Sequence, residues 1–585
     1  MEHCLDDRLR RSGALVGGKF MEFFFPSVLM AASISLSLIV DSIIVSNILG
    51  EDALGAINLI IPVTLCFTAV SGMFGIGSAS CISMFKGKLD PLRADKCLSL
   101  SCLAWLLCSA VGVLLGLFCT PQISAFLSGD SGLEELVARY LRVYLLGSPF
   151  TFITLIFPYI IKADGQPKLS ANALIVANAT NLVLDLVYMG LMDMGIAGGA
   201  LATITGNAVG SCLYVVYIMS KGRTLRLAKL ARGDFRLYGD MFRMSVSSIF
   251  GQALMFAKIW IFNMIVTSTA GKEGLAAFSI CSFCLSFVSL FIAGGAQTMM
   301  PMISAFNGAR DFSAIRLTMR KALKIILLCC VGVTLLFELF PGAIMTVYGI
   351  DDALVLELGM TAVRLFSLAF VGIGFSFMFM YYVQSNGRPA FAMQICALEG
   401  FIIIVPVCLA LSRVLGSEGI WLSYSINEIL VAAFIILRSR HTVAVSGGRL
   451  SGLFMLEEPE QPWLELSVDV SDGELAAAAC EALDAFAREH YGAENAAELA
   501  GLALGLSHRA YGEKPGRKRG ENVDVVAREG RLLFKDMGRD YALLSEAPEL
   551  ERLKDSGCGY ENTLMIGMNY SNIGLKKEAA NGQDV

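Results

Sequence analysis

Long apolar stretches separated by short polar loops dominate the chain from residue 22 to residue 438. About twelve such stretches occur, each of roughly 20 residues, which is the length of helix that spans about 30 Å of hydrocarbon. Hydrophobic residues make up 55% of the 585 residues, and the mean hydropathy is +0.64. A water-soluble protein of this size carries fewer apolar residues. The pattern therefore predicts an all-α polytopic membrane protein with twelve transmembrane helices.

Basic residues indicate which loops lie on the cytoplasmic side. Lysine and arginine gather in every second loop and at both ends of the apolar region, whereas the loops at 50–52, 127–135 and 192–195 are poor in them. Loops rich in lysine and arginine stay in the cytoplasm, so we expect both termini to be cytoplasmic. This distribution predicts a multi-pass protein of the cell membrane, in particular of a bacterial inner membrane. The 16 cysteines have no metal-ligand spacing, and we expect neither disulfides nor a metal cluster.

The apolar region repeats itself. Residues 49–90 align with residues 270–311 at an offset of about 221, and the match continues from the turn at 162–168 to the turn at 384–390. Equivalent loops fall on the same side of the membrane, so the halves are parallel repeats, an arrangement that suits two rocking lobes. The predicted segments are a cytoplasmic N-terminus (1–20), a first six-helix lobe (21–220), a cytoplasmic linker (221–240), a second six-helix lobe (241–440), a further linker (441–461) and a small cytoplasmic α+β domain (462–580).

Three polar side chains interrupt an apolar helix in the first half. Asn178, Asn181 and Asp185 lie within about 60° of one another on a helix, so they share one face. A second acidic residue, Asp41, lies in the first apolar stretch, and ionisable side chains inside a membrane are costly enough to indicate function. A carboxylate flanked by amides can hold Na⁺, and a buried carboxyl group can instead carry a proton. Hydrogen bonding between helices is the alternative role, and it stays open above all for Asn178.

The second half lacks both carboxylates, because Asp41 aligns with Phe262 and Asp185 with about Pro406. It has polar groups of its own within apolar stretches: Gln252, Lys258, Asn263, Glu399 and Glu428. A Lys–Glu pair that faces the interior of the bundle would neutralise two of these charges. The alternative is that the first four of these residues belong to a substrate cavity.

Five features occur together in a fixed order: Asp41, "NILGEDALGAINLIIP", "SGMFGIGSAS", "KADGQPK" and "NLVLDLVYMGLMDMGIAGGALAT". In these features the chain, from residue 20 to about residue 440, resembles the MATE (multidrug and toxic compound extrusion) family. The resemblance implies two lobes that open alternately and export bulky, often cationic compounds as Na⁺ or H⁺ flows inward. It also implies that the cation or proton site consists of Asp41, Asn181, Asp185 and Thr203. Many relatives add an asparagine from the fourth helix, which residues 151–165 lack, so the choice between Na⁺ and H⁺ stays open.

We therefore predict a secondary active multidrug exporter and not an enzyme. Its substrates would be small organic compounds, cationic or amphipathic, and it would need no cofactor besides the coupling ion. We expect a monomer in membrane lipid that binds no nucleic acid. Two alternatives stay open. One is a flippase for lipid-linked precursors, although the first half offers no cation that we can place in a central cavity. The other is a membrane-anchored signalling protein that acts through its C-terminal domain.

After the apolar region the composition becomes acidic and rich in alanine. The pattern predicts a strand, two helices, a hairpin, a third helix and a last strand, an order that resembles the histidine-kinase-type ATPase fold of anti-sigma factors. Asp536 and Gly538 match the adenine-binding Asp-x-Gly turn of that family. Gly505 and Arg509 stand where the family has glutamate and asparagine, and the glycine-rich lid is missing. We expect a remnant of a nucleotide site without ATP binding, and a module that docks a cytoplasmic regulatory protein.

Overall fold

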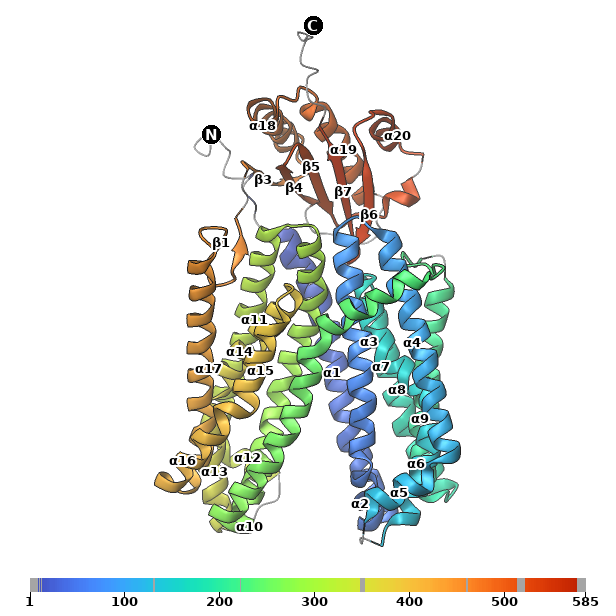
Figure 1. The fold of residues 1–585 in the computed structure, drawn as a ribbon, viewed down its shortest axis with the longest axis vertical. Helices are drawn as coiled ribbons and strands as arrows, with labels where there is room; N and C mark the ends of the chain where they lie inside the picture. The colour runs from blue at the N-terminus through green and yellow to red at the C-terminus, as the bar shows by residue number, and fades with distance from the viewer. Residues whose placement is uncertain are drawn as a thin grey trace.

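The computed structural model describes residues 9, 11, 13–129, 132–220, 222–347, 353–458, 461–512, 521–544 and 546–575. Two bundles of helices converge at one end and diverge at the other, and a small domain containing a sheet lies on the converging end (Figure 1). The segments at 86–90 and 162–168, each with two lysines, also lie at the converging end. This end is therefore the cytoplasmic one.

The transmembrane helices form two lobes. The first lobe consists of α1 (Ala14–Leu49), α2 (Glu51–Leu59), α3 (Ile61–Gly87), α4 (Pro91–Phe118), α5 (Thr120–Ser128), α6 (Glu134–Leu146), α7 (Ser148–Ala163), α8 (Pro167–Asp185), the π-helical turn η2 (Leu186–Leu191) and α9 (Gly195–Met219). After the 3₁₀ helix η3 (Arg232–Arg236), the second lobe consists of α10 (Leu237–Gly308), α11 (Phe312–Leu339), α12 (Pro341–Val347), α13 (Ala353–Ser367), α14 (Phe370–Ser385), α15 (Pro389–Ala397), the π-helical turn η4 (Leu398–Ile402), α16 (Ile404–Leu415) and α17 (Ser417–Val445).

The predicted number of membrane crossings is confirmed in the described part of the chain. Nine helices there are long and apolar enough to cross a membrane, and two bent pairs, α6 with α7 and α13 with α14, raise the number to eleven. The longest helix, α10, is broken at Gly271, where φ is 64° and ψ is −152°. Because glycine adopts this left-handed backbone at little cost, α10 supplies two crossings and the total is twelve.

The turns of the two lobes repeat one another. Leu89 and Arg310 both adopt a left-handed backbone, with φ of 58° and 52°, which is uncommon for residues other than glycine. The next residues, Asp90 and Asp311, cap the following helices, each accepting a hydrogen bond from the backbone N–H three residues later, at 3.0 Å and 2.9 Å. Shared local geometry at the predicted offset confirms the parallel repeat.

The lobes meet at their cytoplasmic ends through a pair of glycines. A Cβ atom at Gly87 of α3 would overlap the backbone oxygen of Ala305 in α10, and one at Gly308 of α10 would overlap that of Met84 in α3. The two glycines are equivalent in the repeat, and small residues at such positions let helix backbones approach closely. At the other end the lobes diverge (Figure 1). The lobes therefore touch at the cytoplasmic end and lie apart at the outer end.

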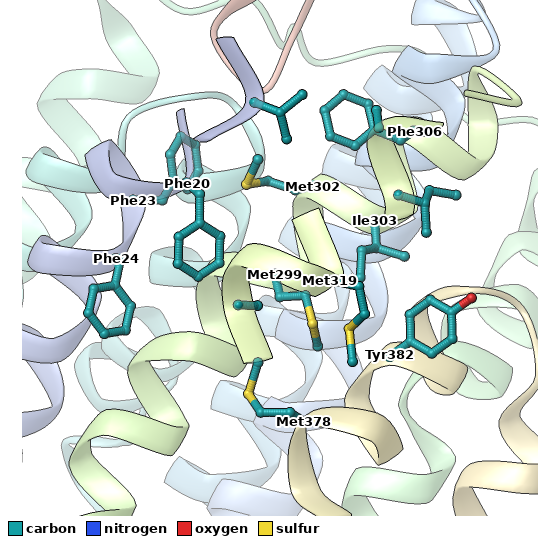
Figure 2. Close-up of a cluster of buried hydrophobic side chains, with 14 of the residues drawn as sticks. Phe20, Phe23, Phe24, Met299, Met302, Ile303, Phe306, Met319, Met378 and Tyr382 are labelled. Carbon is teal, nitrogen blue, oxygen red and sulfur yellow. The ribbon is translucent and has the colours of Figure 1, made fainter. Parts of the chain in front are cut away.

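The first part of α1 packs against the second lobe. Side chains from α1, α10, α11 and α14 meet in one apolar cluster (Figure 2): Phe20, Phe23, Phe24, Met299, Met302, Met319 and Met378. The helix begins at Ala14, earlier than the predicted start of the lobe at residue 21. Leu15 and Val16 are already buried in the same cluster, so their burial explains the longer helix.

The C-terminal domain contains a five-stranded antiparallel sheet in the order β3-β4-β5-β7-β6. Its elements are β3 (Leu464–Asp469), α18 (Gly473–Tyr491), α19 (Ala496–Gly512), β4 (Asn522–Arg528), β5 (Arg531–Asp536), η5 (Tyr541–Leu544), α20 (Pro548–Asp555), β6 (Glu561–Met565) and β7 (Met568–Gly574). A short hairpin, β1 (Leu450–Ser451) with β2 (Leu456–Glu457), lies in the predicted linker. Helices α18 and α19 cover one face of the sheet (Figure 1).

The prediction of a single last strand is wrong. β6 and β7 form a hairpin instead, and its turn consists of Ile566 and Gly567, with φ of 50° and 72°. Two consecutive positive φ angles are the geometry of the tight hairpin turn that asparagine and glycine usually occupy. Isoleucine in the first position conceals this turn in the sequence.

Candidate functional site

Two carboxyl groups meet inside the first lobe. Asp41 comes from α1 and Asp185 is the last residue of α8, and their carboxyl groups lie close enough together to share a hydrogen bond. A hydrogen bond between two carboxyl groups requires a proton on one of them. Asp185 is fully buried, and no N–H or hydroxyl donor in the described ranges reaches its Oδ1 atom. The pair thus combines a buried carboxyl group, that of Asp185, with a half-buried one, that of Asp41, in a site that is rich in acceptors and suited to a proton or a cation.

Asn181 connects this pair to its surroundings. Its amide nitrogen donates to Asp185 Oδ2 at 3.0 Å and to Thr203 Oγ1 of α9 at 3.4 Å, and its oxygen accepts from Ser37 Oγ of α1 at 3.3 Å. Tyr140 of α6 lies beside Thr203 and the two carboxyl groups. The structure therefore brings Asp41 together with the three other residues that the resemblance implied.

The sequence did not identify Ser37 and Tyr140 as members of the group around Asp41 and Asp185. Hydroxyl side chains are common on apolar helices, where they also bond to their own backbone, so their type alone did not mark them. The repeat contained a weak indication, because Ser37 aligns with the charged Lys258. Asn178 lies apart from this group and donates to Ser33 Oγ of α1 at 3.0 Å. This contact joins α8 to α1.

The charged residues of the second lobe form a separate cluster. Lys258 Nζ lies 3.9 Å from Glu399 Oε1 and 5.7 Å from the centre of the Tyr424 ring. Glu428 accepts a hydrogen bond from Ser376 Oγ at 2.8 Å. The structure therefore contains the Lys–Glu pair that the sequence predicted as one alternative. Glu399 lies in the π-helical turn η4, just as Asp185 directly precedes η2, and such wide turns occur often at functional sites.

The four residues predicted for a substrate cavity are not brought together. Lys258 and Glu399 belong to the cluster of the second lobe, whereas the side chain of Asn263 is exposed on α10. Gln252 lines a cavity of about 240 Å³ between the lobes. The polar residues of this lining are Thr68, Ser71, Tyr159, Ser248, Gln252, Gln297 and Tyr381. No carboxylate occurs among the described lining residues.

Lys162 lies beside this cavity, at its cytoplasmic side. It is fully buried near the end of α7 and donates to Gln297 Oε1 of α10 at 2.5 Å. The bond crosses from the first lobe to the second. Lys162 is therefore a cation of the first lobe that adjoins the cavity through Gln297, although it does not itself line the cavity. In the sequence Lys162 lies in a loop rich in lysine, where the usual reading is a solvated charge.

Asp536 of the predicted nucleotide remnant is hydrogen-bonded within the C-terminal domain itself. The Asp536 carboxylate accepts hydrogen bonds from Ser507, Tyr541, Asn569 and the backbone N–H of Gly538. Burial raises the pKa of Asp536 even though these hydrogen bonds act in the opposite direction. A Cβ atom at Gly538 would lie 2.7 Å from that of Ala510 in α19. Asp536 thus ties β5 to the helices around it.

Comparison with known proteins shows the family to which the membrane region belongs. The family model MatE matches residues 26–187 and 247–409. The multidrug export protein MepA of Staphylococcus saprophyticus is 25% identical over 401 residues, covering 67% of this chain and 87% of the relative. MepA of Staphylococcus aureus is 26% identical over 403 residues, covering 67% and 88%.

Solved structures share the fold. The outward-facing conformation of a multidrug resistance MATE family transporter of the MOP superfamily has a TM-score of 0.68 at 20% identity, covering 75% of this chain and 98% of that chain. A MOP superfamily transporter from Pyrococcus furiosus, described as having a binding pocket of reverse polarity, has a TM-score of 0.67 at 20% identity, covering 74% and 97%.

Proposed function

We propose that this chain, which belongs to the MatE family, is a secondary active multidrug exporter driven by the inward flow of H⁺ through the first lobe. The names of the MepA relatives support export of several drugs. Two lobes that touch at one end and lie apart at the other support alternating access. The observation that carries the proposal is that the half-buried Asp41 lies beside the buried Asp185, because a site for a coupling ion needs charge that can change during the cycle.

The arrangement around this pair favours H⁺ over Na⁺. A sodium ion needs several oxygen ligands, but Asn181 turns its amide nitrogen toward Asp185 while its oxygen accepts from Ser37. Two carboxyl groups that share one proton are stable in a buried site, whereas two adjacent carboxylates repel each other. Loss of the proton toward the cytoplasm would therefore change the charge of the site and favour a new arrangement of α1 and α8.

The cavity between the lobes supports amphipathic substrates. Its walls combine the rings of Tyr159 and Tyr381 with the amides of Gln252 and Gln297. Aromatic faces bind flat apolar groups and cations, and the amides can donate to or accept from a polar group. Recognition by these groups tolerates substrates of different shape, as poorly discriminating export requires.

Reconstituted vesicles test the coupling ion directly. Uptake of an amphipathic dye such as ethidium is measured under a pH gradient alone and under a Na⁺ gradient alone at equal pH. We expect the pH gradient to drive uptake, Asp185→Asn to abolish it, and the control Asn178→Ala to retain it. Uptake driven only by Na⁺ would refute the choice of ion. Uptake driven by neither gradient, in protein that reconstitutes normally, would refute the exporter.

Lys162 supports a second candidate function, a flippase for lipid-linked anionic precursors. A buried cation beside the central cavity can pair with a phosphate group, and Lys162 lies there in contact with Gln297. The same vesicles distinguish the two functions. Transfer of a fluorescent lipid-linked diphosphate that Lys162→Met abolishes, without dye uptake by the unaltered protein, would favour the flippase.

A further inference from the structure

The C-terminal domain touches both lobes at their cytoplasmic ends (Figure 1). In the first lobe, the β6–β7 turn packs on the loop after α7, where a Cβ atom at Gly165 would overlap the backbone nitrogen of Gly567. Lys19 of α1 donates to the backbone oxygen of Gly567 at 3.3 Å. In the second lobe, Arg528 at the end of β4 donates to the backbone oxygens of Ala309 and Arg310.

A buried cluster of charges strengthens the contact with the second lobe. Asp311, which caps α11, forms an ion pair with Arg11, whose Nη2 atom lies 2.8 Å from Asp311 Oδ2. It forms a second ion pair with Lys535 of β5. Arg11 lies 3.4 Å from Asp524 of β4 and 3.4 Å from Glu465 of β3. Three neighbouring strands thus present charges on the sheet face that lies opposite α18 and α19. Charges of this kind need their partners in place, because they lie away from water.

The contacts with the two lobes come from one rigid sheet. β5 is paired with β4 on one side and with β7 on the other, so the strands that hold the second lobe cannot move away from the hairpin that holds the first. The two loops that they contact can only be reached together while the lobes are closed on the cytoplasmic side, where Gly87 and Gly308 meet. Opening toward the cytoplasm would separate these loops and break one of the two contacts.

We propose that the side of the C-terminal sheet that faces the transporter is a recognition surface for this chain's own lobes in their cytoplasm-closed arrangement. The domain holds the lobes in this arrangement until one of its two contacts is released. The proposal rests on alternating access, the proposed mechanism of export. It makes the domain a brake on the step that opens the central cavity to the cytoplasm. A cytoplasmic partner that competes for the sheet face would release the brake.

Distances across the open end of the transporter test this proposal without any measurement of transport. Spin labels are placed at Phe126 of α5 and Val414 of α16, two exposed residues at the diverging ends. They are introduced as non-natural amino acids because the chain has 16 cysteines. The full-length protein in lipid nanodiscs is compared with a chain ended after Ser446, with Arg528→Glu and with the control Arg552→Glu. Arg552 is exposed and pairs with Glu498 inside the domain.

We expect one long distance in the full-length protein and in Arg552→Glu. The shortened chain and Arg528→Glu should both gain a population with a shorter distance, as the outer ends close. A shortened chain with the same distances as the full-length protein would overturn the proposal. So would an equal gain of the short distance in Arg552→Glu. All variants are compared at the same pH and without added substrate, and no dye uptake is measured, so a failure of the brake is distinguishable from a failure of the exporter.

Discussion

Replacing Asp311 by asparagine isolates the charge that holds the C-terminal domain on the transporter. Asp311 caps α11 at 2.9 Å and also binds Arg11 and Lys535. Asparagine caps a helix as well as aspartate does, so Asp311→Asn keeps the cap and removes the charge. Asp90→Asn is the matched control, because Asp90 caps α4 at the equivalent turn while its ionic partner Arg93 is 61% exposed.

The two substitutions should differ greatly in their cost. The side chain of Asp311 is 2% exposed and that of Lys535 is 1% exposed. Removing one partner from a buried set of charges costs about 3–5 kcal/mol, whereas an exposed pair contributes about 0–1 kcal/mol. At about 1.4 kcal/mol for each factor of ten, the docking equilibrium should fall roughly 100- to 4,000-fold in Asp311→Asn. In Asp90→Asn it should fall roughly fivefold at most.

Single-molecule energy transfer measures this equilibrium. One dye is attached at Met219, exposed at the cytoplasmic end of α9, and the other at Leu543, exposed in the C-terminal domain. The two transfer efficiencies then count docked and undocked molecules in each variant. We expect undocked molecules to become common only in Asp311→Asn. A shift in Asp311→Asn no larger than that in Asp90→Asn would mean that the buried charges do not hold the domain.

Two further predictions concern Asp311 at the docking contact and Ser37 in the first lobe. Burial would raise the pKa of Asp311, but its two buried cations hold that pKa well below the usual range. A depressed carboxyl pKa stabilises the docked state. This contribution is present above about pH 4 and is lost as the pH falls through the depressed value. The docked fraction should therefore be equal at pH 5 and pH 7 in the energy-transfer assay, and a drop within that range would contradict this assignment. Ser37→Ala removes a hydrogen bond worth about 1 kcal/mol, so proton-driven dye uptake should slow roughly fivefold. The matched Ser33→Ala should leave uptake unchanged, and equal slowing in both would show that Ser37 has no special role.

The two lobes and part of the site could be predicted because they depend on local features. Apolar stretches fix the number of crossings, and the turns that carry Asp90 and Asp311 recur at a constant offset. Asn181 and Asp185 lie four residues apart, a spacing that places them on one helix face whatever the rest of the fold does. Asp41 was joined to them only through resemblance to a family, since no spacing connects the first and fifth crossings.

The remaining features depend on contacts between distant segments. Nothing in the sequence around Lys162 shows that it faces Gln297 of the other lobe rather than water. Ile566 occupies a left-handed position that its side chain type disfavours, so a hairpin was read as one strand. The docking of the C-terminal domain depends on Arg11 and Lys535 meeting at Asp311 from opposite ends of the chain. Patterns within a segment carry no information about such meetings.

The duplication itself explains why we place the proposed ion site in one lobe. At the repeat offset, Lys258 corresponds to Ser37, and both face the helix that forms the fifth crossing of their lobe. In the second lobe this contact is an ion pair, so the carboxylate of Glu399 has a fixed counter-charge 3.9 Å away. In the first lobe it is a bond between a hydroxyl and an amide. No lysine or arginine in the described ranges pairs with Asp41 or Asp185. Their charge must be balanced by something that enters and leaves, and a proton or a cation that does so can drive a transport cycle.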